Sequence, residues 1–433
     1  MQLSLSDKFH SEMARLCPAP LPSVLAIMVS GGSDSLALMM LAHDWAAEMR
    51  QDPDNGPVTL IAITVDHGLR PESAAEAEGV AKIAHDLGID HVTLQWKWDG
   101  VGNLQAAARV ARYSLVQEWR RRKRPEIGAI LVGHTRDDQA ETFLMRLSRG
   151  SGVEGLSAMK ALPLSREAAD AAGAAPVIRP ILWASRADLR AALQTRGMQW
   201  VDDPSNENED YLRVRTRKAM RDLAKIGLDV DTLTRTADQM ARASVALWAR
   251  AADVARDVVT EPYPGILRFD LTRLERIEDE TQLRLLAHGI GCLTQAPYRP
   301  RLSSLEALAD AAHAGRGATL QGVQSFVQDD ALILVRELRA VADYECPADG
   351  SSAWDGRWRI KGRRLGEAVI RPLGAQSLAA LDLPKGLPKA AFQSYPALWA
   401  GQALVAVPYL AREGLCVPQY DPSAEFHQSV LSH

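Results

Sequence analysis

Short apolar runs alternate with amphipathic stretches through the first half of the chain. The runs predict buried strands at residues 24–29, 58–65, 91–96 and 127–132, and the pattern allows a fifth at 177–182. Helical spacing predicts helices at residues 36–49, 72–87, 105–122, 136–147 and 186–196. Short apolar strands that alternate with helices are typical of a parallel sheet covered on both faces. Ligands of such sheets bind at the carboxyl ends of the strands, so functional motifs are expected directly after them.

The pattern changes beyond the fifth strand. An Ala- and Gly-rich segment at 165–176 is typical of a surface insertion. Residues 212–314 have mainly helical spacing, and short strands are expected at 332–335, 357–360 and 404–407. We therefore predict an α/β fold with a Rossmann-like parallel sheet, followed by a helical domain and a small α+β domain. The predicted domains are a catalytic domain at 1–215, a mainly helical domain at 216–340 and a β-rich domain at 341–433.

Charge and cysteine content exclude several classes of protein. Fifty Lys and Arg residues against 54 Asp and Glu residues give a formal net charge of -4, so a nucleic acid would have to be held by local basic clusters. The four cysteines lie far apart, which argues against a disulfide scaffold, a zinc ribbon or an iron–sulfur cluster. No stretch reaches the roughly 20 continuous apolar residues of a membrane helix. We expect a cytoplasmic protein with no membrane partner.

A glycine-rich turn directly follows the first predicted strand. It consists of Ser30, Gly31, Gly32, Ser33, Asp34 and Ser35, and it opens a helix. Glycines allow a sharp turn, and a helix N-terminus offers free N–H groups that bind phosphate. The turn lacks the G-K-[ST] ending of a Walker A loop and the G-x-G-x-x-G pattern of dinucleotide sites. Asp34 would repel phosphate unless it holds Mg²⁺ there. The alternative is a plain strand–helix turn with a serine cap.

A second polar group follows the fourth predicted strand. His134, Asp138 and Glu141 are spaced i, i+4 and i+7, so they share one face near the start of a helix. A carboxylate pair there can hold Mg²⁺, or bind and deprotonate an ammonium group. Asp137 points about 100° away around the helix. The alternative is a carboxylate cluster that only satisfies the helix dipole.

The motifs resemble a known family. The turn at 30–35 is similar to the pyrophosphate-binding loop of the PP-loop ATPases (N-type ATP pyrophosphatases), which cleave ATP to AMP and pyrophosphate. Further motifs follow in order: VDHGLR at 65–70, NLQ at 103–105, GHTRDDQAET at 133–142, LSRGSG at 147–152, RPIL at 179–182, DDPSN at 202–206 and YLR at 211–213. Together they resemble the tRNA(Ile)-lysidine synthetase family over roughly residues 24–220, and the set is far more specific than any one motif.

The resemblance implies a reaction and its partners. Such an enzyme adenylates the C2 oxygen of the wobble cytidine in the CAU anticodon of an isoleucine tRNA. Free L-lysine then displaces AMP to give lysidine, which changes decoding from AUG to AUA and tRNA identity from methionine to isoleucine. The cofactors implied are ATP, as a substrate, and Mg²⁺; a homodimer is compatible with the sequence.

The resemblance also suggests roles for individual residues. The expected catalytic residues are Asp34, Arg112, Asp138 and Glu141, with Asp34 and Asp138 as metal ligands; the expected ATP contacts are Ser30, Gly31, Gly32, Ser33, Asp34, Ser35, Asp66, His67 and His134. Arg112 would neutralise the α-phosphate as charge develops. The alternative for Arg112 is a surface helix, and the family pattern is what favours the functional role. The alternative for His67 is a buried, hydrogen-bonded histidine.

Basic clusters supply candidate tRNA contacts. Residues 120–124 are all basic, and two further clusters lie at 213–221 and 357–364. The predicted tRNA contacts are Arg149, Arg213, Arg215, Arg217, Lys218, Arg357, Arg359 and Lys361. The alternative for each cluster is a solvated charged face. Trp354 and Trp358 flank the last cluster, where core packing is favoured over stacking on a base.

The sequence fits three other functions less well than lysidine formation. A cytidine thiolase of the same superfamily needs sulfur-handling cysteines or a cluster, whereas the predicted catalytic domain contains only Cys17. A small-molecule amide-forming synthetase would usually bring a glutamine-hydrolysing partner and would not need the arginine clusters. A non-catalytic nucleotide- or RNA-binding protein would not need the intact carboxylates at Asp34, Asp138 and Glu141.

Overall fold

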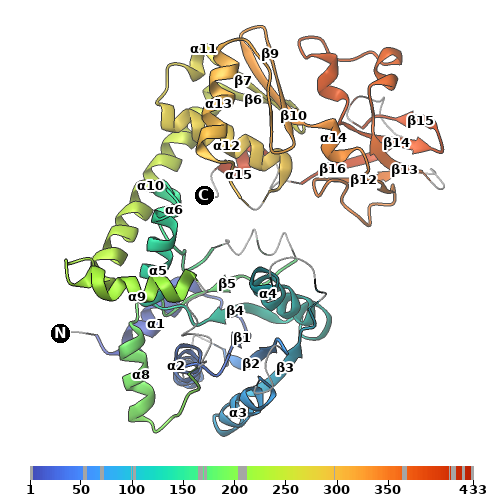
Figure 1. The fold of residues 1–433 in the computed structure, drawn as a ribbon. Helices are drawn as coiled ribbons and strands as arrows, with labels where there is room; N and C mark the ends of the chain where they lie inside the picture. The colour runs from blue at the N-terminus through green and yellow to red at the C-terminus, as the bar shows by residue number, and fades with distance from the viewer. Residues whose placement is uncertain are drawn as a thin grey trace. The chain divides into compact units, whose positions relative to one another are not determined.

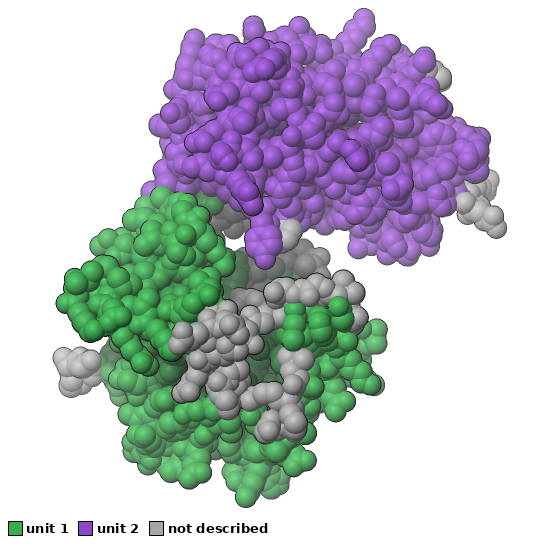
Figure 2. Space-filling view, viewed as in Figure 1, with its two compact units in different colours: residues 1–244 green, residues 245–433 purple. Residues whose placement is uncertain are grey.

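The computed structural model of the chain divides into two compact units, residues 1–244 and 245–433 (Figures 1 and 2). The structure describes residues 3–51, 56–68, 73–98, 100, 104–163, 169, 173–202, 212–296, 298–362, 368–408, 410, 416–421 and 425–430. Most of the insertion predicted at 165–176 lies outside the described residues. The three-domain division remains a prediction, since the second unit contains residues 245–340 of the predicted helical domain together with the predicted last domain.

A five-stranded parallel sheet forms the centre of the first unit. Its strands are β1 (Val24–Met28), β2 (Thr59–Asp66), β3 (Asp90–Gln95), β4 (Ile127–Val132) and β5 (Val177–Ile178), in the order β3-β2-β1-β4-β5. The side chains of β1 alternate: Leu25 and Ile27 enter one hydrophobic core, and Ala26 and Met28 enter the other. Both faces of the sheet are therefore covered, as the apolar runs predict. The fifth strand is shorter than predicted.

Helices cover both faces of this sheet. The core that contains Leu25 is closed by α1 (Leu5–Leu16), α2 (Ser33–Met49), α3 (Ser73–Asp86) and α8 (Arg186–Thr195). The opposite core receives Val116 from α4 (Leu104–Lys123). A smaller core joins α5 (Arg136–Leu147), α6 (Val153–Leu156), α9 (Leu212–Ala224) and the first part of α10 (Val230–Val258). The five helices predicted for this region are confirmed.

The strand order creates the place for a ligand. From β1 the chain proceeds outward through β2 to β3, and β4 then lies on the other side of β1 (Figure 1). The loops that follow β1 and β4 therefore leave neighbouring strands in opposite directions, which opens a crevice at the carboxyl edge of the sheet. The glycine-rich turn follows β1, and the His134 motif follows β4.

The second unit begins with an antiparallel sheet. Its strands are β6 (Val259–Tyr263), β7 (Ile266–Asp270), β8 (Thr319–Leu320), β9 (Val323–Gln328) and β10 (Ala331–Arg336), in the order β6-β7-β10-β9-β8. One face packs on the end of α10 and on α12 (Asp279–Thr294), α13 (Leu302–His313) and α15 (Phe426–Val430), while α11 (Leu271–Leu274) follows β7. The hairpin of β6 and β7 lies in the stretch predicted as mainly helical, which is a correction.

The C-terminal part is β-rich, as predicted. A four-stranded sheet has the order β11 (Cys346–Pro347), β13 (Val369–Pro372), β14 (Pro396–Ala400) and β15 (Ala403–Ala406), and β12 (Trp358–Gly362) pairs with β16 (Cys416–Tyr420). The short helix α14 (Leu338–Val341) precedes β11, and η2 (Gln376–Ala380) and η3 (Lys389–Phe392) lie between β13 and β14. Within the described part of the chain, no helix is both long and apolar enough to cross a membrane.

Candidate active site

The glycine-rich turn is closed by its own hydrogen bonds. The backbone N–H of Ser30 donates to Oγ of Ser35 (3.1 Å), and that hydroxyl donates to the carbonyl of Gly32 (3.0 Å). Gly31 has φ +79°, a conformation that side chains other than glycine rarely adopt. No side chain caps the N-terminus of α2. The free N–H groups of this helix start are therefore available to an anion, as phosphate binding requires.

The end of β4 packs directly on this turn. A Cβ atom on Gly133 would lie 3.0 Å from Cα of Ser35 and 3.1 Å from the carbonyl carbon and oxygen of Asp34. These contacts are backbone atoms that no side-chain rotation can relieve. The absence of a side chain at Gly133 therefore lets the end of β4 pack against the glycine-rich turn, which is a geometric reason for a glycine at this position.

Helix α5 begins with a reciprocal cap. The hydroxyl of Thr135 accepts a hydrogen bond from the N–H of Asp138 (3.3 Å), and Oδ2 of Asp138 accepts one from the N–H of Thr135 (2.9 Å). The helix-dipole alternative is thus correct for one oxygen of Asp138. The other oxygen, Oδ1, is directed to the arginines described next.

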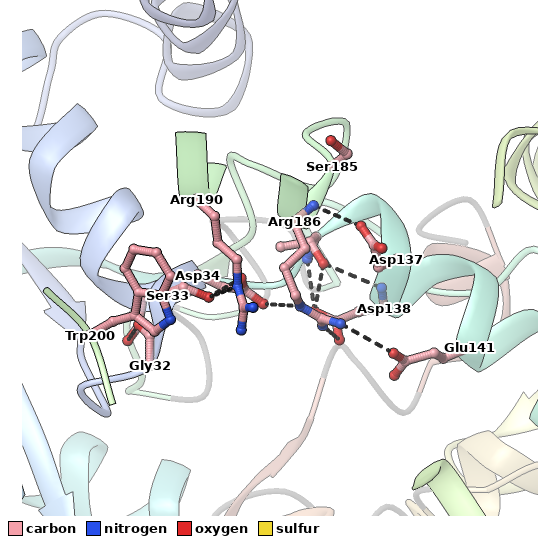
Figure 3. A network of polar contacts seen from close by, with 12 residues as sticks. Gly32, Ser33, Asp34, Asp137, Asp138, Glu141, Ser185, Arg186, Arg190 and Trp200 are labelled. Atoms are coloured by element: carbon pink, nitrogen blue, oxygen red, sulfur yellow. Dashed lines mark hydrogen bonds and ion pairs between the residues drawn. The ribbon is translucent and has the colours of Figure 1, made fainter. Parts of the chain in front are cut away.

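Asp34, Asp138 and Glu141 form an acidic cluster around the guanidinium of Arg186 (Figure 3). Nε of Arg186 lies 3.0 Å from Oδ2 of Asp34. Its Nη2 lies 3.2 Å from Oδ1 of Asp138, and its Nη1 lies 3.6 Å from Oε1 of Glu141. Because Asp34 belongs to α2 and the other two acids belong to α5, one side chain from α8 ties the two helix starts together. The three carboxylates predicted as catalytic are therefore close in space.

Two arginines of α9 complete the charge balance. Arg213 contacts Oδ1 of Asp138 through Nη2 (2.9 Å) and Oε2 of Glu141 through Nε (2.5 Å). Arg217 contacts Oε1 of Glu141 through Nε (2.5 Å). The side chain of Glu141 is only 1% exposed, so a cation partner is required for it to be charged there.

This pairing bears on the predicted tRNA contacts in α9. Arg213 and Arg217 hold carboxylates in this structure, whereas Arg215 and Lys218 are exposed on the same helix. The cluster at 213–221 therefore has an inner and an outer part. A phosphate contact by Arg213 or Arg217 would require a change of partner.

The pKa directions separate the two aspartates. Burial raises the pKa of Asp34, although the nearby Arg186 partly offsets the effect. Burial also opposes the charge of Asp138, but Arg213 and Arg186 together outweigh it and lower the pKa of Asp138. Burial alone would lower the pKa of Arg186, yet Asp34 and Asp138 raise it overall, so this arginine is charged. Of the two aspartates, Asp34 is therefore the one whose negative charge is less well compensated.

A second group of predicted residues lies at the end of β2. Oδ1 of Asp66 accepts a hydrogen bond from the N–H of Gly68 (2.8 Å), which fixes the turn after the strand. The ring of His67 stands edge-on to Trp96, with 5.6 Å between ring centroids. Burial and the charge of Arg112 lower the pKa of His67, so this imidazole is neutral at pH 7. Nδ1 of His67 is buried and has no hydrogen-bond partner among the described residues, which suits a nucleotide contact.

His134 is held from the side of β5. Nε of Arg179 donates to Nδ1 of His134 (3.0 Å), and Nη1 of the same arginine donates to the carbonyl of Lys160 (2.8 Å). Arg149 is exposed on the turn after α5. Their assigned roles in ATP and tRNA binding remain predictions.

The structure corrects one predicted tRNA contact. Arg357 is 2% exposed and pairs with the buried Asp355, so its guanidinium does not face solvent. Within the cluster at 357–364, Arg359 and Lys361 are exposed on β12, beside a groove. Residues 363 and 364 lie outside the described residues. Trp354 and Trp358 are each 1% exposed, which confirms core packing.

Three residues near the site, Arg186, Arg190 and Trp96, are not among those predicted from the sequence. Arg186 occupies the first helical position of α8, where the helix dipole disfavours a cation, and this position was the available signal. Arg190, one turn later, donates to Oγ of Ser33 (3.2 Å). Trp96 directly follows β3 at the ligand-binding edge of the sheet. All three residues are distant in sequence from the glycine-rich turn at 30–35.

Two carboxylates fit a magnesium ion. Among the described residues there is no group of three or more His, Cys, Asp or Glu side chains placed to hold a metal. Nucleotide-bound Mg²⁺ usually needs only one or two carboxylates, because phosphates and water supply the other ligands. Asp34 and Asp138 contact Nε and Nη2 of the one guanidinium of Arg186, so both carboxylates face the same cation.

Comparison with known proteins agrees with this geometry. A family model described as a PP-loop domain matches residues 5–223. A protein named tRNA(Ile)-lysidine synthase from Ruegeria pomeroyi is 37% identical over 416 residues, which is 95% of this chain and 95% of the relative. Proteins of the same name from Wolbachia pipientis (32% identical; 81% of this chain, 80% of the relative) and Mesorhizobium japonicum (34%; 91% and 84%) are also similar. A solved U34-tRNA thiolase from Methanococcus maripaludis covers 54% of this chain and 78% of its own, with a TM-score of 0.43 and 16% identity, too low to bear on function. The chain therefore belongs to the tRNA(Ile)-lysidine synthase family, and the N-terminal part of it is a PP-loop domain.

Proposed function

We propose that this protein is an ATP-dependent ligase that joins free L-lysine to C2 of the wobble cytidine of the isoleucine tRNA with a CAU anticodon. The observation that carries the proposal is the convergence of Asp34, Asp138 and Glu141 beside the glycine-rich turn. Membership of the family over nearly the whole chain supplies the substrate class. The products would be lysidine, AMP and pyrophosphate.

The first step would be adenylation of the cytidine. The N–H groups at the start of α2 would bind the β- and γ-phosphates, with Asp34 and Asp138 holding Mg²⁺. Bound Mg²⁺ would supply neutralisation of phosphate charge. The C2 oxygen would attack the α-phosphorus and pyrophosphate would leave, giving an adenylated cytidine. Arg112, whose charge acts on His67 at the end of β2, would neutralise the α-phosphate.

The second step would be attack by lysine. The ε-ammonium is nucleophilic only after it loses a proton, so a carboxylate must bind it and accept that proton. Asp138 and Glu141 are the candidates for this role. The amine nitrogen would form a bond to C2, and the bond from C2 to oxygen would break. AMP would leave with the former cytidine oxygen.

Exposed cations would hold the tRNA. Arg149, Arg215 and Lys218 in the first unit, and Arg359 and Lys361 in the second, are exposed and can reach phosphates. Binding through such contacts weakens steeply as salt rises. Because the substrate is tRNA, we propose a cytoplasmic location. Dimer formation remains a prediction.

The test uses purified protein, Mg-ATP, radiolabelled lysine and two transcripts with a CAU anticodon, one of isoleucine type and one of methionine type. Acid-precipitable label is measured on each transcript, and AMP is measured in the same reaction. The proposal expects label on the isoleucine transcript alone, together with released AMP. ATP cleavage that depends on another acceptor, without label on either transcript, would refute the lysidine assignment but would be consistent with the proposed ATP site.

A further inference from the structure

The guanidinium of Arg186 makes more ion pairs than a single salt bridge would. Its guanidinium contacts three carboxylates at once, and two of them, Asp34 and Asp138, are the candidate metal ligands (Figure 3). We propose that Arg186 is the resident cation of the ligand-free site: its guanidinium occupies the position of the divalent metal, and the metal displaces it. The inference rests on the proposed function only for the identity of the natural metal as Mg²⁺.

The atoms involved support a shared cation position. Oδ1 of Asp34 accepts a hydrogen bond from the hydroxyl of Ser33 (3.1 Å), while its Oδ2 contacts Arg186. Oδ2 of Asp138 is engaged in the helix cap with Thr135, while its Oδ1 contacts Arg186. Each aspartate thus has one oxygen fixed by its own helix start and one in contact with Arg186, although Oδ1 of Asp138 also contacts Nη2 of Arg213 (2.9 Å). Two oxygens that point at one cation would point equally at a metal ion in its place.

The remaining charges show what happens when Arg186 leaves. Glu141 keeps the two guanidiniums of α9, and Asp138 keeps Arg213. Among the described residues, Arg186 is the only cation in contact with Asp34. Without Arg186, the negative charge of Asp34 would have no cation in contact among the described residues, and that of Asp138 would have only Arg213. Uncompensated, partly buried carboxylates attract a replacement cation strongly.

The side chain can move without its backbone. The N–H of Arg186 donates to Oδ2 of Asp137 (2.8 Å), and Oγ of Ser185 caps the same helix by accepting from the N–H of Asp188 (3.0 Å). These bonds hold the start of α8 independently of the guanidinium. A displaced guanidinium would remain tethered beside the glycine-rich turn, where it can pair with phosphate oxygens. Arg186 is thus a positioning residue in the free protein and a candidate phosphate partner in the loaded one.

The experiment measures metal binding to the full-length protein without nucleotide. Mn²⁺ alone is titrated and its free concentration is followed by electron paramagnetic resonance, for wild type, Arg186→Gln and Arg190→Gln. Arg190 is the matched control, since it lies one turn along α8 and contacts Ser33 but neither metal-ligand carboxylate. Arg186→Gln is expected to bind Mn²⁺ at least about tenfold more tightly than wild type, because no resident cation must be displaced. Arg190→Gln is expected to stay within about threefold of wild type, since it removes an equal charge at longer range.

Opposite outcomes would overturn the inference. A folded Arg186→Gln protein that binds Mn²⁺ no better than wild type, or less well, would show that the guanidinium and the metal do not share a position. An equal gain in Mn²⁺ affinity in Arg190→Gln would show that the effect comes from the change in net charge and not from the position of Arg186. Thermal unfolding checks that each variant is folded. Should Arg186→Gln not fold, Arg186→Lys decides: its single ammonium makes fewer contacts, so an intermediate gain is expected and no gain refutes the proposal. Absence of lysine ligation by wild type would refute the proposed function without altering the Mn²⁺ result.

Discussion

Gly133 offers a direct test of how the site is assembled, because its missing side chain lets β4 touch the glycine-rich turn. The substitution Gly133→Ala adds one methyl group at the end of the strand. That carbon would lie 3.0–3.1 Å from backbone atoms of Ser35 and Asp34. We expect the methyl group to push the turn away from β4 and to impair ATP use more than folding.

The magnitude follows from contact distances. Carbon atoms pack best at about 3.5–4.0 Å, so the methyl group is roughly 0.5–1 Å too close to its neighbours. Overpacking of this kind typically costs about 1–3 kcal/mol of folding stability. A displacement approaching 1 Å in a catalytic group can lower the rate by about 100-fold. We therefore expect kcat/KM for ATP to fall by about 10–100-fold.

The assay is AMP release at varied ATP, with saturating lysine and isoleucine-type transcript, alongside thermal unfolding. Gly128→Ala is the control, since Gly128 lies in the same strand and its added carbon would meet Cβ of Pro22 at 2.5 Å, a contact outside the acidic cluster and the glycine-rich turn. Gly128→Ala should lower stability with little change in kcat/KM for ATP. Equal losses of kcat/KM in both variants, or wild-type kcat/KM in Gly133→Ala, would refute the claim that this contact positions the turn.

Three further predictions address the remaining groups. Burial and Arg112 lower the pKa of His67 in the folded protein, so His67 of the unfolded chain is protonated first as the pH falls below about 6.5. Between pH 7.5 and 5.5, the free energy of unfolding should therefore fall more in wild type than in His67→Gln. Urea titrations measure this difference, and equal losses would contradict the prediction. Arg357→Ala should destabilise the second unit by about 1–3 kcal/mol, because the buried Asp355 loses one of its two arginine partners and keeps only Arg336. Denaturant unfolding measures this change, and a wild-type midpoint would show that the pair with Arg357 contributes nothing. The double variant Arg359→Ala and Lys361→Ala should weaken tRNA binding and reduce the magnitude of the slope of log affinity against log salt by about 1–2. Its unfolding midpoint should stay at the wild-type value. An unchanged slope would show that these two residues do not contact tRNA phosphates.

Much of the fold could be predicted because local pattern and global structure agree. Continuous apolar runs are unambiguous when both faces of a strand are buried, as in β1 and β4. The fifth strand was overestimated because Pro180 follows within its apolar run and cannot donate to a ladder. The β6–β7 hairpin was missed because its strands are short, with a proline in the first, and helices surround them in sequence.

The carboxylates of the site could be predicted from the sequence, but the arginines that pair with them could not. Asp34 and Asp138 stand directly after strands, where the topology of a parallel sheet brings motifs together. Their arginine partners are distant in sequence: Arg186 is 152 residues from Asp34, and Arg213 is 75 residues from Asp138. No local pattern reports such a pairing, so the basic residues of α9 were assigned to tRNA as one patch.

Helical spacing could have divided that patch. In α9, Arg213 and Arg217 are four residues apart and share one face, while Arg215 and Lys218 are three apart and share another. The first pair neutralises Glu141, and the second pair is exposed. A buried carboxylate can recruit only the cations on the facing side of a helix, so a single basic run can serve two roles. Basic clusters on predicted helices should therefore be divided by helical face before any of their members is assigned to a nucleic acid.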